Sequence, residues 1–213
     1  MCIRDRAIAE RERVPRLRAW ALLGMALVAM QQTAWQRAGV LATEVLTLFR
    51  ALGETHGCAW ALLILARAAV ATGNLALAEQ RHTERLAYER ALGHREGTAL
   101  TLMDLADVFL RQDNTQEATR QYVESLRLWR ELGAYDRIFQ VAERVAELAA
   151  GRGLAERAAQ LREAALMVRT TLTAVVQGER WTEWHHDADS PQVEATVRRL
   201  LEQLMAEANA LVG

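Results

Sequence analysis

The residues best suited to metal or acid–base chemistry lie together near the C-terminus, in the segment Trp181–Asp189. The segment contains two imidazoles, from His185 and His186, and several carboxylates, and both kinds of group are common zinc ligands. Neighbouring side chains point in different directions on a helix or a strand, so a shared site would require an irregular loop. We therefore interpret the segment as a polar connector whose Trp181 and Trp184 pack on the helices before it. A metal-binding or enzymatic domain is the alternative.

The rest of the sequence lacks the motifs that identify common enzyme classes. It contains no glycine-rich phosphate loop, dinucleotide fingerprint, His-Glu-x-x-His zinc motif, nucleophile elbow or Cys-x-x-Cys pair. All 26 basic residues are arginine, so no lysine amine can act as a nucleophile. We therefore predict that the chain is not an enzyme, has no catalytic residues and requires no metal or cofactor.

Charge and composition narrow the class of protein further. The 26 basic and 27 acidic residues nearly cancel, which leaves no net field for direct binding of nucleic acid or anionic lipid. Periodicity alone does not exclude a helix-turn-helix, but the balanced charge argues against one. Only two prolines are present, and the abundance of Ala, Leu, Arg and Glu favours long helices. These features predict an all-helical protein that binds neither nucleic acid nor membranes directly.

Glycine and alanine recur along the chain at a spacing of 40 residues. Residues 53–92 and 93–132 align without gaps and are identical at 12 of 40 positions, all of them glycines, small residues, leucines or polar residues near turns. The recurring positions are Gly53, Gly93 and Gly133 in one turn, Gly73, Asp113 and Gly153 in a second turn, and Ala26, Ala66, Ala106, Ala146, Ala38, Ala78, Ala118 and Ala158 in the helices. Self-similarity at this period is typical of stacked helical hairpins.

One repeat, residues 57–92, shows how a hairpin would form. Its first helix is apolar around most of its circumference and must be buried on several sides. Gly73 suits the left-handed conformation that ends a helix, and an amphipathic second helix follows. Ala66 and Ala78 lie on these facing helices, where small side chains allow close approach. The pattern predicts helices at 16–31, 34–51, 57–72, 75–92, 97–112, 115–132, 136–150 and 154–170.

This pattern resembles a tetratricopeptide-type repeat. Leu65-Ala66 corresponds to the Leu-Gly/Ala pair of that family, Gly73 to its turn glycine, Ala78 to its second small residue and Leu86 to the leucine that follows. The family's usual period is 34 residues, so each hairpin here is longer, and the large aromatic residue of the first helix is present only at Phe109. HEAT-type repeats share the longer period but lack these glycine and small-residue positions. We therefore predict an all-α fold, a right-handed α-solenoid of four tetratricopeptide-like hairpins.

A narrower resemblance concerns residues 124–133 and 155–165. They resemble the last repeats of large bacterial signalling proteins in which a nucleotide-binding switch domain precedes a C-terminal repeat array, LuxR-type transcriptional activators among them. The resemblance covers residues 17–172, and none of the catalytic motifs of such parents occurs in this chain. It implies a protein–protein interaction or effector-sensing scaffold within a larger bacterial signalling or transcriptional regulator.

By analogy with the tetratricopeptide family, partners should bind on the inner surface that the first helix of each hairpin lines. The predicted partner-binding groove consists of Trp60, Leu63, Arg67 and Val70, then Leu100, Met103, Asp107 and Leu110, then Gln140, Glu143, Glu147 and Ala150. The first rows are mostly apolar and the last is acidic, so a protein or peptide partner with an apolar end and a basic end would complement them. Other domains of a parent chain are included among such partners. The alternative is that these side chains simply pack between repeats.

The two ends of the chain differ from the repeats. Residues 1–6 can be encoded by the end of a transposon used to prepare sequencing libraries, and we interpret them as a sequencing-adapter artefact in a metagenomic gene. We assign residues 7–172 to the array, 173–190 to the connector and 191–213 to a C-terminal capping helix. That helix is expected to cap the stack, with a homodimer seam as the alternative. Its apolar stripe is Val193, Val197, Leu200, Leu204, Ala208 and Leu211.

Two features bear on the cellular compartment. Cys58 is the one cysteine outside residues 1–6 and cannot form an internal disulfide, which favours a reducing compartment. Residues 19–30 are uncharged like the core of a signal peptide and too short to span a bilayer. Because Met25-Ala26 falls in register with Leu65-Ala66, a helix buried in the array explains the segment better. We therefore expect a cytoplasmic protein in which Cys58 is a buried thiol.

Replacing both His185 and His186 with Gln should leave the fold and partner binding unchanged. The reason is that the sequence offers no third nitrogen or sulfur ligand near these two rings. Calorimetric titration of the metal-free protein with zinc tests this, with the double Gln variant as the control. Stoichiometric zinc binding that the variant loses would establish a metal site and overturn the connector interpretation.

Overall fold

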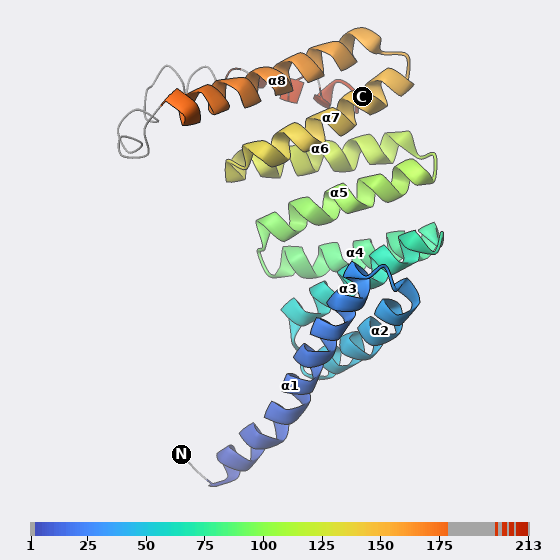
Figure 1. Ribbon diagram of the computed structural model, residues 1–213, viewed down its shortest axis with the longest axis vertical. Coiled ribbons are helices and arrows are strands. Elements are labelled where there is room, and N and C mark those ends of the chain that lie inside the picture. The colour runs from blue at the N-terminus through green and yellow to red at the C-terminus, as the bar shows by residue number, and fades with distance from the viewer. Residues whose placement is uncertain (1–2, 179–198, 200–201, 204, 207, 213) are drawn as a thin grey trace. The chain divides into compact units, whose positions relative to one another are not determined.

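The computed structural model describes residues 3–178, 199, 202–203, 205–206 and 208–212. Within these residues every regular element is helical, as the sequence predicts, and no strand occurs. Figure 1 shows the helices, which are α1 Ile3–Gln31, α2 Trp35–Ala51, α3 Thr55–Ala71, α4 Leu75–Ala91, α5 Arg95–Arg111, α6 Thr115–Leu132, α7 Tyr135–Gly151 and α8 Ala155–Gly178.

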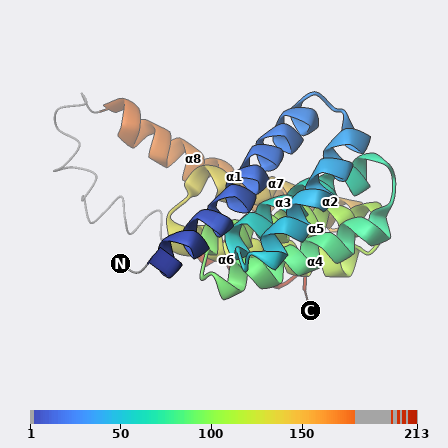
Figure 2. The same ribbon diagram turned by 90° about the horizontal axis from the view of Figure 1, so that it is seen from below.

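The chain divides into two compact units. Unit 1 spans Met1–Gln112 and contains α1 to α5, while unit 2 spans Asp113–Gly213 and contains α6 to α8. In unit 1, α1 pairs with α2 and α3 with α4, and each pair lies side by side in opposite directions (Figures 1 and 2). The first helix of one pair also packs on the second helix of the pair before it, α3 on α2 and α5 on α4. In unit 2, α7 packs on α6 and pairs with α8.

The predicted alanine positions are the closest contacts within the pairs. All eight of these alanines are at most 1% exposed. They are Ala26, Ala66, Ala106 and Ala146 on the first helices and Ala38, Ala78, Ala118 and Ala158 on the second helices. Burial at every repeat confirms that small residues set the approach of the helices, because a larger side chain would force them apart.

The turns recur every 20 residues with a left-handed backbone. The glycines at this spacing have φ between 65° and 79°. Thr33 and Asp113 take the same conformation without being glycine, with φ of 56° and 60°. At most of these turns the following N–H donates to a carbonyl five residues earlier, as Glu54 does to Phe49 over 2.9 Å. This bond satisfies a carbonyl that the helix end leaves without a partner.

The first and last described helices are longer than the sequence predicts. α1 begins at Ile3 rather than at residue 16, so Pro15 lies inside a helix although proline favours the first turn. Ala, Arg and Glu dominate the preceding residues and are good helix formers. α8 continues to Gly178 rather than ending near residue 170. The other helix ends agree with the prediction within two residues.

Some predicted features lie outside the described residues. These include the segment Trp181–Asp189 and most of the last apolar stripe. Of that stripe, Ala208 and Leu211 are described and buried. In unit 2, Arg152 on the α7–α8 turn donates to the carbonyl of Leu211 over 2.8 Å. These contacts fit a capping role, which stays a prediction.

Two further expectations concern unit 1 and the helices. Cys58 is buried, as predicted, and burial raises the pKa of its thiol. In the part of the chain that the structure describes, no helix combines the length and the hydrophobicity needed to cross a membrane.

Thr33→Gly should stabilise unit 1 by about 0.5–1 kcal/mol. A β-branched residue pays a steric cost in the left-handed region that glycine does not, and this gain exceeds the extra chain entropy of glycine in the unfolded state. Urea denaturation of both proteins measures the change. The control is Thr72→Gly in the equivalent α3–α4 turn, where φ is −92° and glycine should destabilise. A loss of stability in Thr33→Gly would show that its left-handed backbone carries no strain.

Candidate functional site: a ring cluster and an ion network in unit 1

Five aromatic and imidazole rings from four helices of unit 1 and one helix cap gather at one place, which we call the ring cluster. Trp20 packs on Phe49 with ring centroids 4.9 Å apart. His56 lies 6.4 Å from each of Trp20, Trp60 and His94. The two indoles are 38% and 40% exposed. The cluster therefore presents two partly exposed indole rings and two imidazoles to solvent.

The repeat register explains how these rings meet. Trp20 and Trp60 occupy the same position in α1 and α3, 40 residues apart. Phe49, near the end of α2, lies directly over Gly57 at the start of α3. A Cβ at Gly57 would come within 2.5–2.7 Å of the Phe49 ring carbons, so only glycine lets the ring settle there. Phe49 then supports Trp20 from below.

A chain of charged side chains, which we call the ion network, continues inward from the ring cluster. His94 Nδ1 lies 2.7 Å from Glu89 Oε2, and the other oxygen of Glu89 lies 3.3 Å from Arg85 Nη2. Arg85 Nη1 donates to Asp104 Oδ2 over 3.4 Å, and Arg67 Nη2 lies 3.8 Å from the same oxygen. Glu89 and Arg85 are buried, whereas Arg67 is half exposed. The network thus links a buried ion pair to solvent through His94 and Arg67.

The network occupies positions that are apolar or uncharged in the equivalent helices. The buried face of α4 carries His82, Arg85 and Glu89. At the same positions α2 has Ala42, Val45 and Phe49, and α6 has Tyr122, Ser125 and Trp129. Burying ions costs free energy that pairing offsets only in part. The substitution of ionisable for uncharged residues in α4 therefore marks it as the helix whose buried face does more than pack.

Burial shifts the pKa of three groups in and beside the network. Burial raises the pKa of Asp104, while Arg67 and Arg85 act in the opposite direction. Burial also lowers the pKa of Arg85, against the attraction of Asp104 and Glu89. Burial, together with Arg85 and Arg67, lowers the pKa of His82 to about 3. His82 is therefore neutral at neutral pH, and its Nδ1 and Arg85 Nε have no hydrogen-bond partner among the described atoms.

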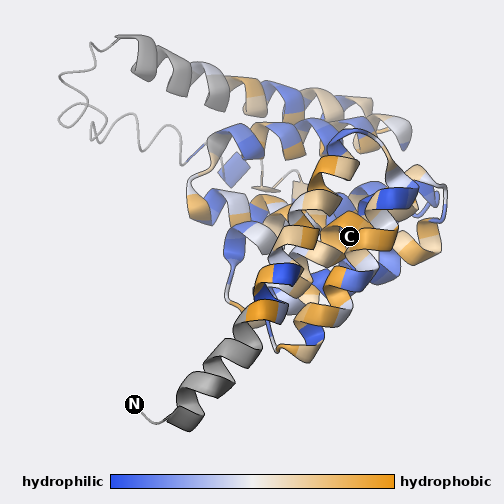
Figure 3. Ribbon diagram, turned by 60° about the horizontal axis from the view of Figure 1, so that its bottom comes forward, coloured by the Kyte–Doolittle hydropathy of each residue, from blue (hydrophilic) through white to orange (hydrophobic). Residues whose placement is uncertain are grey.

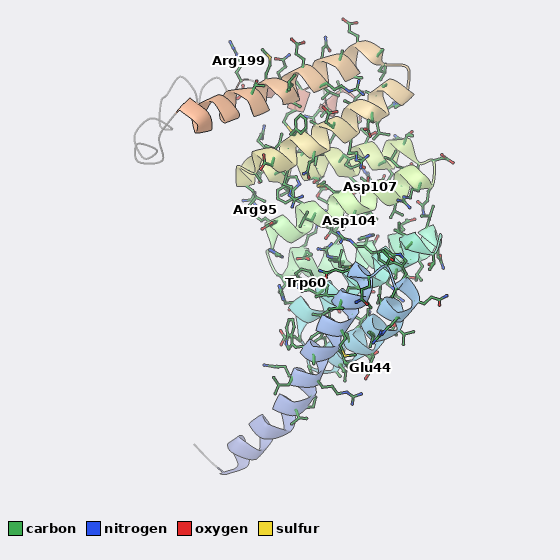
Figure 4. The ribbon with its side chains drawn as sticks, in the orientation of Figure 1. Glu44, Trp60, Arg95, Asp104, Asp107 and Arg199 are labelled. Carbon is green, nitrogen blue, oxygen red and sulfur yellow. The ribbon has the colours of Figure 1, made fainter. Side chains whose placement is uncertain are left out.

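The structure places the predicted groove residues on the first helices, in two separate sets. In unit 1, Trp60 and Arg67 are exposed and Leu63 is buried, whereas the half-buried residues are Val70, Leu100, Met103, Asp107 and Leu110. Figure 4 labels Trp60 on α3 and Asp104 and Asp107 on α5. In unit 2, α7 exposes Gln140, Glu147 and Ala150, while Glu143 is half buried and lies 3.8 Å from Arg162.

The sequence prediction missed most of the ring cluster and the ion network. It named Trp60 and Arg67 but not Trp20, His56 or His94, because these come from different hairpins that only stacking brings together. The signal for the network was present in the sequence. Comparing α4 with its equivalents at a spacing of 40 reveals three ionisable residues at positions that are otherwise uncharged.

The surface suits binding rather than catalysis. Indole rings stack on apolar groups and attract cations over their faces, and a half-exposed guanidinium such as Arg67 can pair with a carboxylate. Among the described residues, no group of three or more His, Cys, Asp or Glu side chains is placed to hold a metal ion.

Comparison with known proteins establishes the fold class. A scan of protein-family models and a search of curated proteins both give no match. Solved structures are similar in fold. The apo form of RapI has a TM-score of 0.65 at 10% identity, covering 91% of this chain and 84% of that one. BtubC from P. vanneervenii has a TM-score of 0.62 at 19% identity, covering 100% and 89%. A putative kinesin light chain of Podosopora anserina with TPR-like repeats has a TM-score of 0.59 at 17% identity, covering 92% and 95%.

These similarities show a tetratricopeptide-like helical repeat array, as the glycine and alanine positions predict. At such low identities they show the fold alone, and function must be argued from the site.

His82→Leu should flatten the dependence of stability on pH between about pH 7 and pH 5. In the native protein His82 takes up a proton near pH 3, whereas in the unfolded chain it does so near 6.5. The unfolded state therefore binds more protons in this window, and stability falls as pH is lowered, by up to about 2 kcal/mol at pH 5. Asp104, whose pKa is raised, is present in both proteins and cancels from the comparison.

Urea denaturation at both pH values measures this difference. Thr101→Val is the matched control, since it removes a buried hydroxyl on α5 that donates to Gly97 and does not titrate. It should lower stability equally at both pH values. If His82→Leu keeps the wild-type loss on acidification, His82 is not the buried neutral imidazole that the structure indicates.

Proposed function

We propose that the array is a non-catalytic protein- or peptide-binding and effector-sensing scaffold of a larger cytoplasmic bacterial signalling or transcriptional regulator. The observation that carries the proposal is the ring cluster, where Trp20 and Trp60 stay partly exposed on the first helices, on the surface where repeat arrays of this fold class are expected to bind partners. Exposed tryptophans beside arginine are the residues that most often dominate binding energy.

The chemistry of the predicted groove residues suggests the partner. The unit 1 residues on α3 and α5 are mostly apolar, with Arg67 and Asp107 as charged exceptions. Those on α7 include Glu143 and Glu147. A peptide with aromatic or aliphatic side chains and with basic side chains complements both sets, because indole faces also attract arginine and lysine.

The assignment to a regulator rests on the resemblance of residues 124–133 and 155–165 to the last repeats of LuxR-type and related proteins. A repeat array in such a protein contributes recognition rather than chemistry, which fits the absence of catalytic motifs from this sequence. The scaffold would pass the binding of a protein or small effector to other domains of its parent.

A library of random short peptides displayed on phage tests the scaffold function directly. Selection on the full chain should enrich peptides rich in aromatic and basic residues. Trp60→Ala should weaken binding of the enriched peptides by roughly tenfold or more, since tryptophan truncation at a binding surface costs about 2 kcal/mol or more. Fluorescence anisotropy with synthetic copies of the enriched peptides gives the affinities.

The matched control is Leu92→Ala, which truncates an equally exposed apolar side chain, 39% against 40%, at the end of α4. It should leave the affinities unchanged. Failure to enrich any sequence, or equal effects of the two substitutions, would contradict binding at the ring cluster.

A further inference from the structure

One face of α1 is apolar and exposed. It consists of Leu17, Ala21, Gly24, Met25 and Val28, which we call the α1 stripe. Leu17, Met25 and Val28 are 59%, 48% and 52% exposed. Four of the five residues, with Ala29, Gln32 and Arg37, line an open hollow of about 360 Å³. Figure 3 shows apolar residues along this part of α1. Such a continuous apolar face on a soluble helix indicates an unfilled contact.

The same register face on the later helices of unit 1 is covered. Forty residues on, α3 carries Gly57, Ala61, Ile64, Leu65 and Ala68, and all of these except Leu65 are buried. Helix α2 covers them. Its Phe49 lies over Gly57, and a Cβ at its Gly39 would meet the Ala68 Cβ at 3.8 Å. This face is therefore the one that receives the second helix of the preceding hairpin.

The contact between α4 and α5 follows the same rule. Glu89 on α4 lies over Gly97 on α5. Arg85 on α4 pairs with Asp104 on α5, which is the register position of Ile64 and Gly24. These contacts assign partners across the interface. The position of Phe49 and Glu89 faces that of Leu17, and the position of Val45 and Arg85 faces that of Gly24.

The described part of the chain leaves the α1 stripe uncovered. Residues 3–13 continue α1 as one straight helix instead of turning back, as the chain does at Gly53 and Gly93 (Figure 1). The opposite side of α1, with Ala19, Leu23 and Ala26, is the side that packs within unit 1. The helix position occupied by α2 on α3, and by α4 on α5, is thus unfilled on α1.

We propose that the α1 stripe docks an amphipathic helix of a partner protein in the manner in which α3 holds α2. The sizes of the facing residues define that helix. Leu17 stands where α3 and α5 have glycine, so the partner needs a small residue at the position of Phe49. Gly24 leaves a hollow where α3 has Ile64, so the partner needs a large apolar residue at the position of Val45. The required helix therefore has the pattern of α2 with these two sizes exchanged.

Two synthetic peptides test this size rule on the full chain. The parent peptide is residues 33–53 of this sequence, and the exchanged peptide carries Val45→Phe and Phe49→Ala. Fluorescence anisotropy should show the exchanged peptide binding roughly tenfold or more tightly than the parent peptide, because only the exchanged peptide fits both Leu17 and Gly24.

Gly24→Glu in the full chain should abolish binding of the exchanged peptide. A Cβ at Gly24 meets nothing within 4 Å, and glutamate favours helix more than glycine does, so the fold is retained while the hollow is filled. Val40→Glu, at an exposed valine on α2, is the matched control and should bind normally. Trp60→Ala should also bind normally, which separates this surface from the ring cluster.

Three results would overturn the proposal. They are absence of binding by the exchanged peptide, equal affinity of the two peptides, and binding that survives Gly24→Glu. A fourth result would reassign the occupant. If sedimentation shows that the full chain dimerises and that Gly24→Glu alone abolishes the dimer, the helix comes from a second copy of this chain and not from a different protein.

Discussion

The stacking of each second helix on the first helix that follows is the contact on which both surfaces of unit 1 depend. At the centre of this contact a large side chain meets a residue without one. Phe49 covers Gly57, and Glu89 covers Gly97, where a Cβ would lie 2.5 Å from both the Glu89 carboxyl carbon and His94 Nδ1. In unit 2, Trp129 at the same position meets Arg137, whose guanidinium lies 5.9 Å from the ring. A repeated backbone therefore accepts a ring, a carboxylate or a cation–π pair at a single register position.

This exchange at one position has an energetic consequence. Phe49 and Trp129 bury large apolar surfaces, which stabilise their interfaces by the hydrophobic effect. Glu89 gives up that gain and adds the cost of burying a charge, which Arg85 and His94 offset by pairing. Since a repeat protein gains its stability from contacts between neighbours, the α4–α5 interface is a place where stability is exchanged for a connected set of charges. Such an exchange is expected where a surface has a function beyond packing.

The sequence alone predicts the fold well because each hairpin follows local rules. Turn residues at a spacing of 20 and alanines at a spacing of 40 determine where helices end and approach, and these rules need no knowledge of distant contacts. The start of α1 was predicted wrongly because Pro15 was treated as a helix start. The ring cluster was largely missed, since Trp20, His56 and His94 belong to three hairpins and meet only after stacking. The ion network was within reach, because His82, Arg85 and Glu89 depart from the uncharged pattern of α2 and α6.

The same register face thus has two uses in unit 1. Inside the array it is covered by a neighbouring helix, and small changes in its residues decide whether rings or ions are brought together beside it. On α1 it faces solvent, with Leu17 where the inner repeats have glycine and Gly24 where they have Ile64 or Asp104. A helix that fits the inner faces would clash at Leu17 and leave a void at Gly24. The α1 stripe therefore differs from the inner faces in shape while sharing their hydrophobicity, and shape is what would let it discriminate a partner helix from the helices of its own array.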